Sequence, residues 1–139
     1  MAKAFDNDVI VIGSGPGGEG AVMKCAKSGK NVAMVEENPL VGGNCTHRAT
    51  IPSKSLRHTI QMMADLGDYG DVDFQQMLRL AESVIDQQVD LRRTFYERND
   101  LYVAAGRARF TDPHTIEVAL TAGGSETHTA GAFILATGS

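Results

Sequence analysis

A glycine-rich segment near the start of the chain has the composition of a phosphate-binding turn. It lies between the β-branched run 9–12 and a stretch of helical periodicity at residues 19–28. In such a turn the first glycine permits a tight bend, the second lets the backbone approach a ligand, and the last allows a helix to pack on the strand. The free N–H groups at the start of that helix attract phosphate. The segment, which predicts a site for the pyrophosphate of a dinucleotide, reads Gly13, Ser14, Gly15, Pro16, Gly17, Gly18.

An acidic residue follows at the place where a dinucleotide site needs one. The apolar run 32–35 predicts a second buried strand and ends on Glu36. A carboxylate there can accept hydrogen bonds from a ribose diol and would repel a ribose 2′-phosphate, so it favours FAD or NAD over NADP. These features alone do not separate FAD from NAD, and a glycine turn that binds no ligand is the alternative.

The rest of the chain predicts the elements that hold these residues. After a loop at 37–44 we expect one helix from Cys45 to about Leu66, kinked near Pro52, then a turn-rich gap at 67–73 and a long helix over 74–98. The apolar stripe of the long helix is Met77, Leu78, Ala81, Val84, Ile85, Gln88, Leu91 and Phe95. The methionines of both helices are interpreted as packing residues.

Short strands dominate the last third of the chain. Three are expected at 102–110, 115–120 and 126–129, with turns at 112–113 and 123–124, and a separate buried strand at 132–136. The predicted fold class is α/β: a Rossmann-like domain with a parallel sheet, long helices and a small antiparallel β-meander, spanning residues 1–139.

Composition excludes several classes of function. The 139 residues carry a net charge of −4, which disfavours nucleic-acid binding, and they include no apolar run long enough to span a membrane. Two cysteines are too few for a disulfide framework, so we expect a cytoplasmic protein. His47 and His58 lack neighbours that could complete a metal site, and none is predicted. Because residues 132–136 predict a buried strand close to Ser139, we expect a longer protein.

A second motif begins at the glycine pair of residues 42 and 43. With Cys45, Pro52 and Lys54 it resembles the GG-x-C-x-x-x-x-C-x-P-x-K motif of the pyridine nucleotide–disulfide oxidoreductases, the family of lipoamide dehydrogenase and glutathione reductase. The resemblance covers the whole chain and implies FAD as the cofactor. Thr50 stands where the second cysteine of the redox disulfide should be. One thiol cannot form a disulfide, which excludes dithiol chemistry.

The transhydrogenase branch of this family has the same loss. Resemblance to it implies an enzyme that transfers hydride between NADPH and NAD⁺ through FAD, with NAD and NADP as substrates and a homo-oligomeric full-length form. This chain would be its FAD-binding part, inactive alone, with NAD(P)-binding and dimerisation domains beyond residue 139. A stand-alone FAD-binding module and a lipoamide-dehydrogenase-like flavoprotein are the alternatives.

The resemblance also assigns roles to individual residues. Lys54 would lie near the flavin N5, where a cation stabilises reduced flavin; a plain surface lysine is the alternative. Cys45 is interpreted as a packing or FAD-contact residue, in preference to a reactive thiol. Residues expected along the adenosine ribose and pyrophosphate are Glu36, Glu37, Asn38, Pro39, Leu40, Val41, Gly42, Gly43, Asn44 and Cys45. Those expected at the adenine are Gly106, Arg107 and Ala108, and those of the closing loop are Ala136, Thr137 and Gly138.

Overall fold

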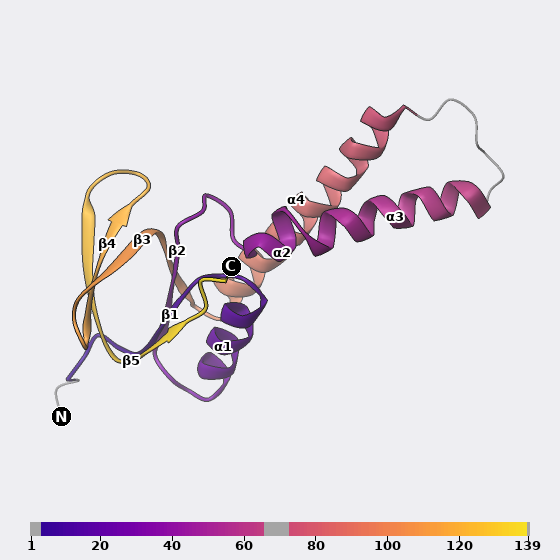
Figure 1. Cartoon of the computed structure of the whole chain (residues 1–139). Helices are drawn as coiled ribbons and strands as arrows, with labels where there is room; N and C mark the ends of the chain where they lie inside the picture. The colour runs from indigo at the N-terminus through magenta and orange to yellow at the C-terminus, as the bar shows by residue number, and fades with distance from the viewer. Residues whose placement is uncertain (1–3, 66–72, 139) are drawn as a thin grey trace.

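The computed structural model describes residues 4–65 and 73–138. Most of the predicted turn-rich gap, residues 67–72, lies outside the described residues. A strand-rich body carries one packed helix on its side, and two long helices extend away from it as a hairpin (Figure 1). The elements in chain order are β1 (Asn7–Ile12), α1 (Pro16–Lys27), β2 (Val32–Glu36), α2 (Gly43–His47), α3 (Thr50–Asp65), α4 (Phe74–Arg98), β3 (Tyr102–Asp112), β4 (Thr115–Leu120) and β5 (Ser125–Leu135).

A parallel sheet forms the centre of the body. β1 lies between β2 and β5, and β2 also pairs with the first part of β3, all in parallel. Successive side chains of a strand point to opposite faces, so Ile10 and Val11 enter different cores. Val11 and Met34 pack with residues of α1 and α4, whereas Ile10 and Val35 pack with residues of the antiparallel strands. Burial on both faces explains why β1 and β2 read as continuous apolar runs.

Two strands belong to both sheets. β3 pairs with β2 through residue 105 and then antiparallel with β4, while β5 pairs first with β4 and then, from Ala130, in parallel with β1. The pairings close into a ring of five strands. The prediction of separate strands at 126–129 and 132–136 was therefore wrong. At Gly131 a Cβ would lie 3.2 Å from the Asp8 carbonyl oxygen, so a glycine lets β5 continue closely along β1.

The helix expected from residue 45 to about 66 is two helices. The carbonyl oxygen of Asn44 accepts from the backbone N–H groups of both Arg48 and Ala49, at 2.9 Å each, which ends α2 and starts a new direction. Pro52 is the third residue of α3, where the missing N–H costs nothing, because the first N–H groups of a helix have no partner within it.

The bounds predicted for α4 are confirmed, and so is its apolar stripe up to Gln88, but the predicted stripe residues Leu91 and Phe95 are exposed. The Asp73 side chain accepts from the Gln75 N–H and caps the helix. Val89 and Tyr96 are buried in the core on the α1 side, whereas Leu91 is 63% and Phe95 38% exposed. A step of seven residues is two helical turns, so Val89 and Tyr96 share the face that meets α1.

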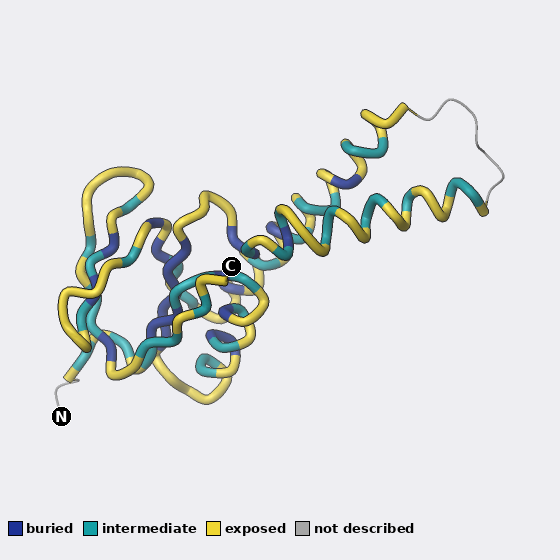
Figure 2. Tube along the Cα trace, in the orientation of Figure 1, coloured by how far each residue is buried: buried dark blue, intermediate teal, exposed yellow. Residues whose placement is uncertain are grey.

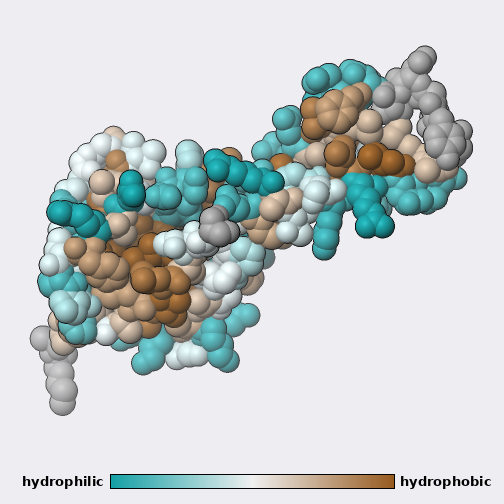
Figure 3. Space-filling model, in the orientation of Figure 1, coloured by the Kyte–Doolittle hydropathy of each residue, from teal (hydrophilic) through white to brown (hydrophobic). Residues whose placement is uncertain are grey.

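Few residues of the α3–α4 hairpin are buried. α3 contributes no buried residue, and the contrast with the body is visible in Figure 2. Met62 is 51% exposed, so its predicted packing role was wrong. Apolar atoms gather on the hairpin surface at the upper right of Figure 3. Among the described residues no helix has the length and apolarity to cross a membrane. The parallel sheet, the βαβ start and the covering helices make this an α/β, Rossmann-like fold.

Candidate functional site

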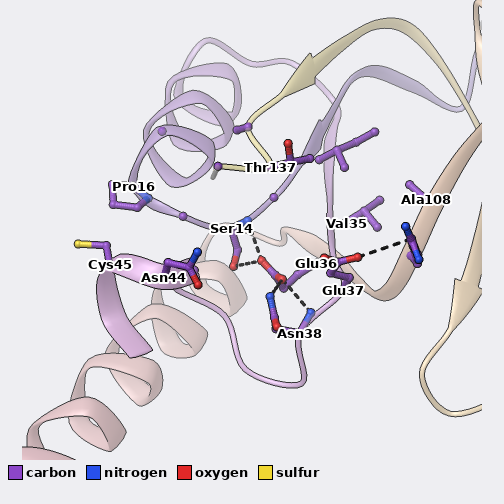
Figure 4. Close-up of a pocket in the computed structure, with 18 of the residues that line it drawn as sticks. Ser14, Pro16, Val35, Glu36, Glu37, Asn38, Asn44, Cys45, Ala108 and Thr137 are labelled. Carbon is purple, nitrogen blue, oxygen red and sulfur yellow. Dashed lines mark hydrogen bonds and ion pairs between the residues drawn. The ribbon is translucent and has the colours of Figure 1, made fainter. Parts of the chain in front are cut away.

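A cavity of about 800 Å³ opens at the carboxyl ends of β1 and β2. In open α/β sheets ligands bind at this edge, because the helix N-termini point there. Figure 4 shows the glycine turn, the end of β2, the start of α2 and the end of β5 around it. Its walls are Ile12, Gly13, Ser14, Gly15, Pro16, Gly17, Val35, Glu36, Glu37, Asn38, Gly43, Asn44, Cys45, Arg48, Gly106, Arg107, Ala108, Ala136, Thr137 and Gly138.

Two of the four glycines of the turn are required by steric contacts with backbone. Gly13 has φ +107°, and a Cβ there would collide with the carbonyl oxygen of Ala136. At Gly18 a Cβ would collide with the carbonyl oxygen of Gly13, so this glycine sets how closely α1 packs on the turn. Gly15 and Gly17 have nothing within 4 Å of such an atom and face open space. The turn therefore combines two packing positions with a bare backbone edge on the cavity.

The N-terminus of α1 is prepared for an anion. Its N-cap is Gly15, with no side chain to satisfy the first N–H groups, and Pro16 follows at the first helical position. Glu19 in the first turn would oppose an anion, but Arg92 of α4 donates to it at 3.0 Å. This ion pair is partly buried, with the Arg92 side chain 14% exposed.

Glu36 is the centre of a buried hydrogen-bond network. Its Oε2 accepts from the N–H and the hydroxyl of Ser14, at 2.9 and 2.5 Å, and its Oε1 accepts from the N–H and side-chain amide of Asn38, at 2.8 and 2.9 Å (Figure 4). Burial by itself raises the pKa of Glu36, but the Ser14 and Asn38 hydrogen bonds outweigh it and hold the pKa below its ordinary value. The carboxylate thus stays ionised and fastens the turn to the end of β2.

The second glycine pair packs directly on the first motif. The Gly42 N–H donates to the Ser14 hydroxyl at 2.9 Å, and a Cβ on Gly43 would lie 2.8 Å from the Cα of Gly15. Both glycines have positive φ, +117° and +62°, which side chains rarely adopt. Ser14 therefore joins the glycine turn, Glu36 and the loop before α2 into one unit.

The wall opposite the turn comes from β3. Gly106 can have no side chain, because a Cβ would collide with the carbonyl oxygen of Ala119 on β4. Beside it, Arg107 lies 3.8 Å from Glu37, an ion pair in which the side chains are 84% and 64% exposed. Such a long and exposed pair contributes little stability.

The two cysteines lie in different parts of the protein. Cys45 lines the cavity, whereas Cys25 packs against the core between α1 and the sheet, and both thiols are free. Thr50 is exposed at the start of α3 and does not line the cavity. Among the described residues no cluster of three or more histidine, cysteine or acidic side chains could hold a metal ion.

Not all residues expected at the site reach this cavity. Gly18 lies beneath the turn, and Val41 and Gly42 are buried behind it. Pro39 and Leu40 line an adjoining hollow of about 210 Å³, with His47 and Arg48, and exposed Lys54 lines neither space.

Three wall residues were missed by sequence reasoning. Ile12 and Val35 end their strands at the cavity, a position that the strand ends themselves could have indicated. Arg48 lies one helical turn after Asn44, and this spacing within the motif was a usable signal.

The βαβ fold, the uncapped helix and the acidic residue at the end of β2 define a dinucleotide-binding domain. A model of the pyridine nucleotide-disulphide oxidoreductase family matches residues 7–139, and the chain belongs to this family. Over its whole length it is 48% identical to a soluble pyridine nucleotide transhydrogenase of Vibrio vulnificus and 45% identical to one of Escherichia coli O9:H4. The chain spans about a third, 32%, of the length of these curated relatives.

Solved structures agree with the fold. The HOCl-induced flavoprotein disulfide reductase RclA of Escherichia coli superposes with a TM-score of 0.76 at 25% identity, over 94% of this chain and 28% of that one. Its Cu(II) complex gives a TM-score of 0.79 at 24% identity, over 99% of this chain and 29% of that one.

Proposed function

We propose that this chain binds FAD as part of an oxidoreductase that transfers hydride between NADPH and NAD⁺ without a redox disulfide. One observation carries the FAD assignment: both glycine motifs, Glu36 and the end of β5 meet on a single cavity. Its volume of about 800 Å³ lies within the range of small-molecule and cofactor sites. Similarity to relatives named as soluble pyridine nucleotide transhydrogenases supports the reaction.

The residues present fit this cofactor. Gly15 and Gly17 leave the bare N-terminus of α1 facing the cavity, where the backbone N–H groups would hold the pyrophosphate. Glu36 and the β3 residues Gly106, Arg107 and Ala108 would border the adenosine. Bound flavin supplies a hydride acceptor and donor at N5. The protein's part is to orient that group and to exclude water from it.

The role of Glu36 is more constrained than the sequence indicates. Its oxygens already accept four hydrogen bonds, so a ribose hydroxyl would have to replace one donor. Asn38 is exposed whereas Ser14 is buried, so the amide of Asn38 is the donor most easily exchanged.

Absence of a second thiol at the motif supports a reaction without a disulfide. Cys45 has Thr50 where a partner cysteine would stand, and Cys25 belongs to a different part of the core. A hydroxyl cannot replace a thiolate in disulfide exchange. This argues against a lipoamide-dehydrogenase-like or other disulfide reductase, although RclA shares the fold.

The whole protein is proposed to be a cytoplasmic homo-oligomer that acts on small dinucleotides and not on nucleic acid or membranes. NAD(P)-binding and dimerisation domains would follow residue 139, in keeping with the 32% coverage of the relatives. Exposed apolar residues on the α3–α4 hairpin, among them Ile60 and Leu80, support self-association. Lys54 and the closing residues Ala136, Thr137 and Gly138 would lie at the flavin and pyrophosphate ends.

The visible spectrum of the purified chain tests cofactor binding. After addition of FAD and removal of the excess, flavin bands at about 370 and 450 nm should remain with the protein. A colourless protein would contradict the FAD assignment for this chain. ADP-ribose and NADP⁺ added as competitors test the preference, and only the former should displace FAD.

Activity assays of two forms test the reaction. The full-length protein should reduce a NAD⁺ analogue with NADPH, whereas the 139-residue chain should not. Lipoamide-dependent oxidation of NADH by the full-length protein would instead favour the disulfide reductase.

A further inference from the structure

Four charged side chains line the cavity, and Arg48 is the one that has no partner among the described residues. The ionised carboxylate of Glu36 accepts four hydrogen bonds, and Glu37 pairs with Arg107 at 3.8 Å. Arg48 makes no side-chain hydrogen bond or ion pair with any other residue in ranges 4–65 and 73–138. A guanidinium that faces a cavity with no carboxylate to hold it is available to a ligand anion.

The backbone holds Arg48 at a defined corner. Its N–H donates to the carbonyl oxygen of Asn44 at 2.9 Å, and the N–H of Ala49 donates to the same atom. Arg48 is thus the C-cap of α2, at the break between α2 and α3. Asn44 and Arg48 are one helical turn apart, which explains why both line the cavity.

This corner adjoins the phosphate-binding turn. α2 begins at Gly43, whose Cβ would lie 2.8 Å from the Cα of Gly15, the N-cap of α1. Arg48 also borders the adjoining hollow of about 210 Å³, so its side chain lies where the two spaces meet. The glycine turn itself contains no lysine or arginine. The backbone N–H groups alone would otherwise have to balance a doubly charged pyrophosphate.

We propose that Arg48 binds the pyrophosphate of the dinucleotide from the C-terminal end of α2, beside the α1 N-terminus. This inference rests on the proposed function, since it assigns a further residue to the same site. The guanidinium would donate two hydrogen bonds to phosphate oxygens, a geometry that arginine provides and a point charge does not. It would act in binding and not as a catalytic residue.

Titration calorimetry with ADP and adenosine tests the assignment. Because the two ligands share the adenosine and differ in the phosphates, Arg48→Gln should weaken ADP binding by roughly tenfold and leave adenosine binding unchanged. Arg48→Lys should recover part of the affinity. Arg57→Gln is the matched control: it removes an equal charge at an exposed residue of α3 that does not line the cavity.

Four outcomes would contradict the assignment, and a fifth would support it. An equal loss of ADP and adenosine binding in Arg48→Gln would overturn the phosphate assignment, as would a loss for ADP no larger than that of Arg57→Gln. Unchanged ADP affinity in Arg48→Gln would overturn this inference and leave the proposed function intact. Failure of the parent chain to bind either ADP or FAD would overturn both. A weaker dependence of ADP affinity on salt in Arg48→Gln would add support.

Discussion

The substitution Glu36→Gln should destabilise this chain, and its neighbour provides the control. The carboxylate accepts four hydrogen bonds, from Ser14 and Asn38, and is only 5% exposed. Glutamine supplies one oxygen and one NH₂ group, so two donors lose their acceptor. The side chain of Asn38 can turn to accept from the new NH₂, but its backbone N–H cannot. The bonds to Ser14 also lose their charge.

The magnitude follows from these losses. One unsatisfied N–H and two weakened charge-assisted bonds together cost about 2 kcal/mol of unfolding free energy. For a chain of this size that lowers the Tm by roughly 6–10 °C. Glu37→Gln removes the same charge from an exposed side chain with a 3.8 Å partner, and should cost less than about 0.5 kcal/mol.

Thermal unfolding at several pH values checks both the size and the cause. Because hydrogen bonds hold the pKa of Glu36 below its ordinary value of 4.5, its stabilisation is present above that value and is lost as the pH falls through the lower folded-state pKa. This loss should be missing in Glu36→Gln. Equal Tm values for the two variants, or the parent's acid dependence retained in Glu36→Gln, would refute the reasoning.

Three further predictions concern other parts of the molecule. Gly15→Ala should fold normally and lose FAD affinity in a fluorescence titration, whereas Gly18→Ala should unfold at a much lower temperature. The reason is that an added Cβ collides with backbone at Gly18 and meets nothing at Gly15. Similar Tm values for the two variants would contradict this. Tyr96→Phe should raise the free energy of unfolding by up to about 1 kcal/mol in urea titration, because the buried hydroxyl has no hydrogen-bond partner among the described residues. A clear loss of stability would show that the hydroxyl does have a partner. The hydrogen bond from Tyr102 lowers the pKa of Glu126, so its contribution should fade as the pH drops, and Glu126→Gln should flatten that part of the pH–Tm profile.

Much of the fold follows from local patterns. The predicted bounds of α4 and β4 agree with the structure, because an aspartate cap, an asparagine at the far end and the flanking turns mark them. The turn after β4 includes the expected residues 123–124, whereas the turn before β4 lies at 113–114 and not at 112–113, because β3 continues to Asp112. The predicted element bounds were wrong where contacts between segments remote in sequence determine the structure. The continuity of β5 depends on β1, and the break between α2 and α3 depends on two N–H groups that share the carbonyl oxygen of Asn44.

For the candidate site, too, local spacing predicted some features and contacts between remote segments decided others. Spacing indicated the glycine turn and Glu36, because their functions depend on backbone freedom and on position along a strand. Spacing did not indicate that Ser14 would connect Glu36 to Gly42, since that contact joins residues 28 apart in sequence. It also placed Leu40 and Lys54 with the rest of the site, although neither reaches the main cavity.

By itself, the sequence determined the βαβ unit, the positions that require glycine and the loss of the second motif cysteine, because each depends on residue type and short-range order. Only the tertiary structure decided which charges face the cavity unpaired, which face of α4 is buried, and that β3 and β5 each serve two sheets. These properties depend on the distances between segments remote in sequence. Charge pairing and burial are set by such distances, and local pattern does not specify them.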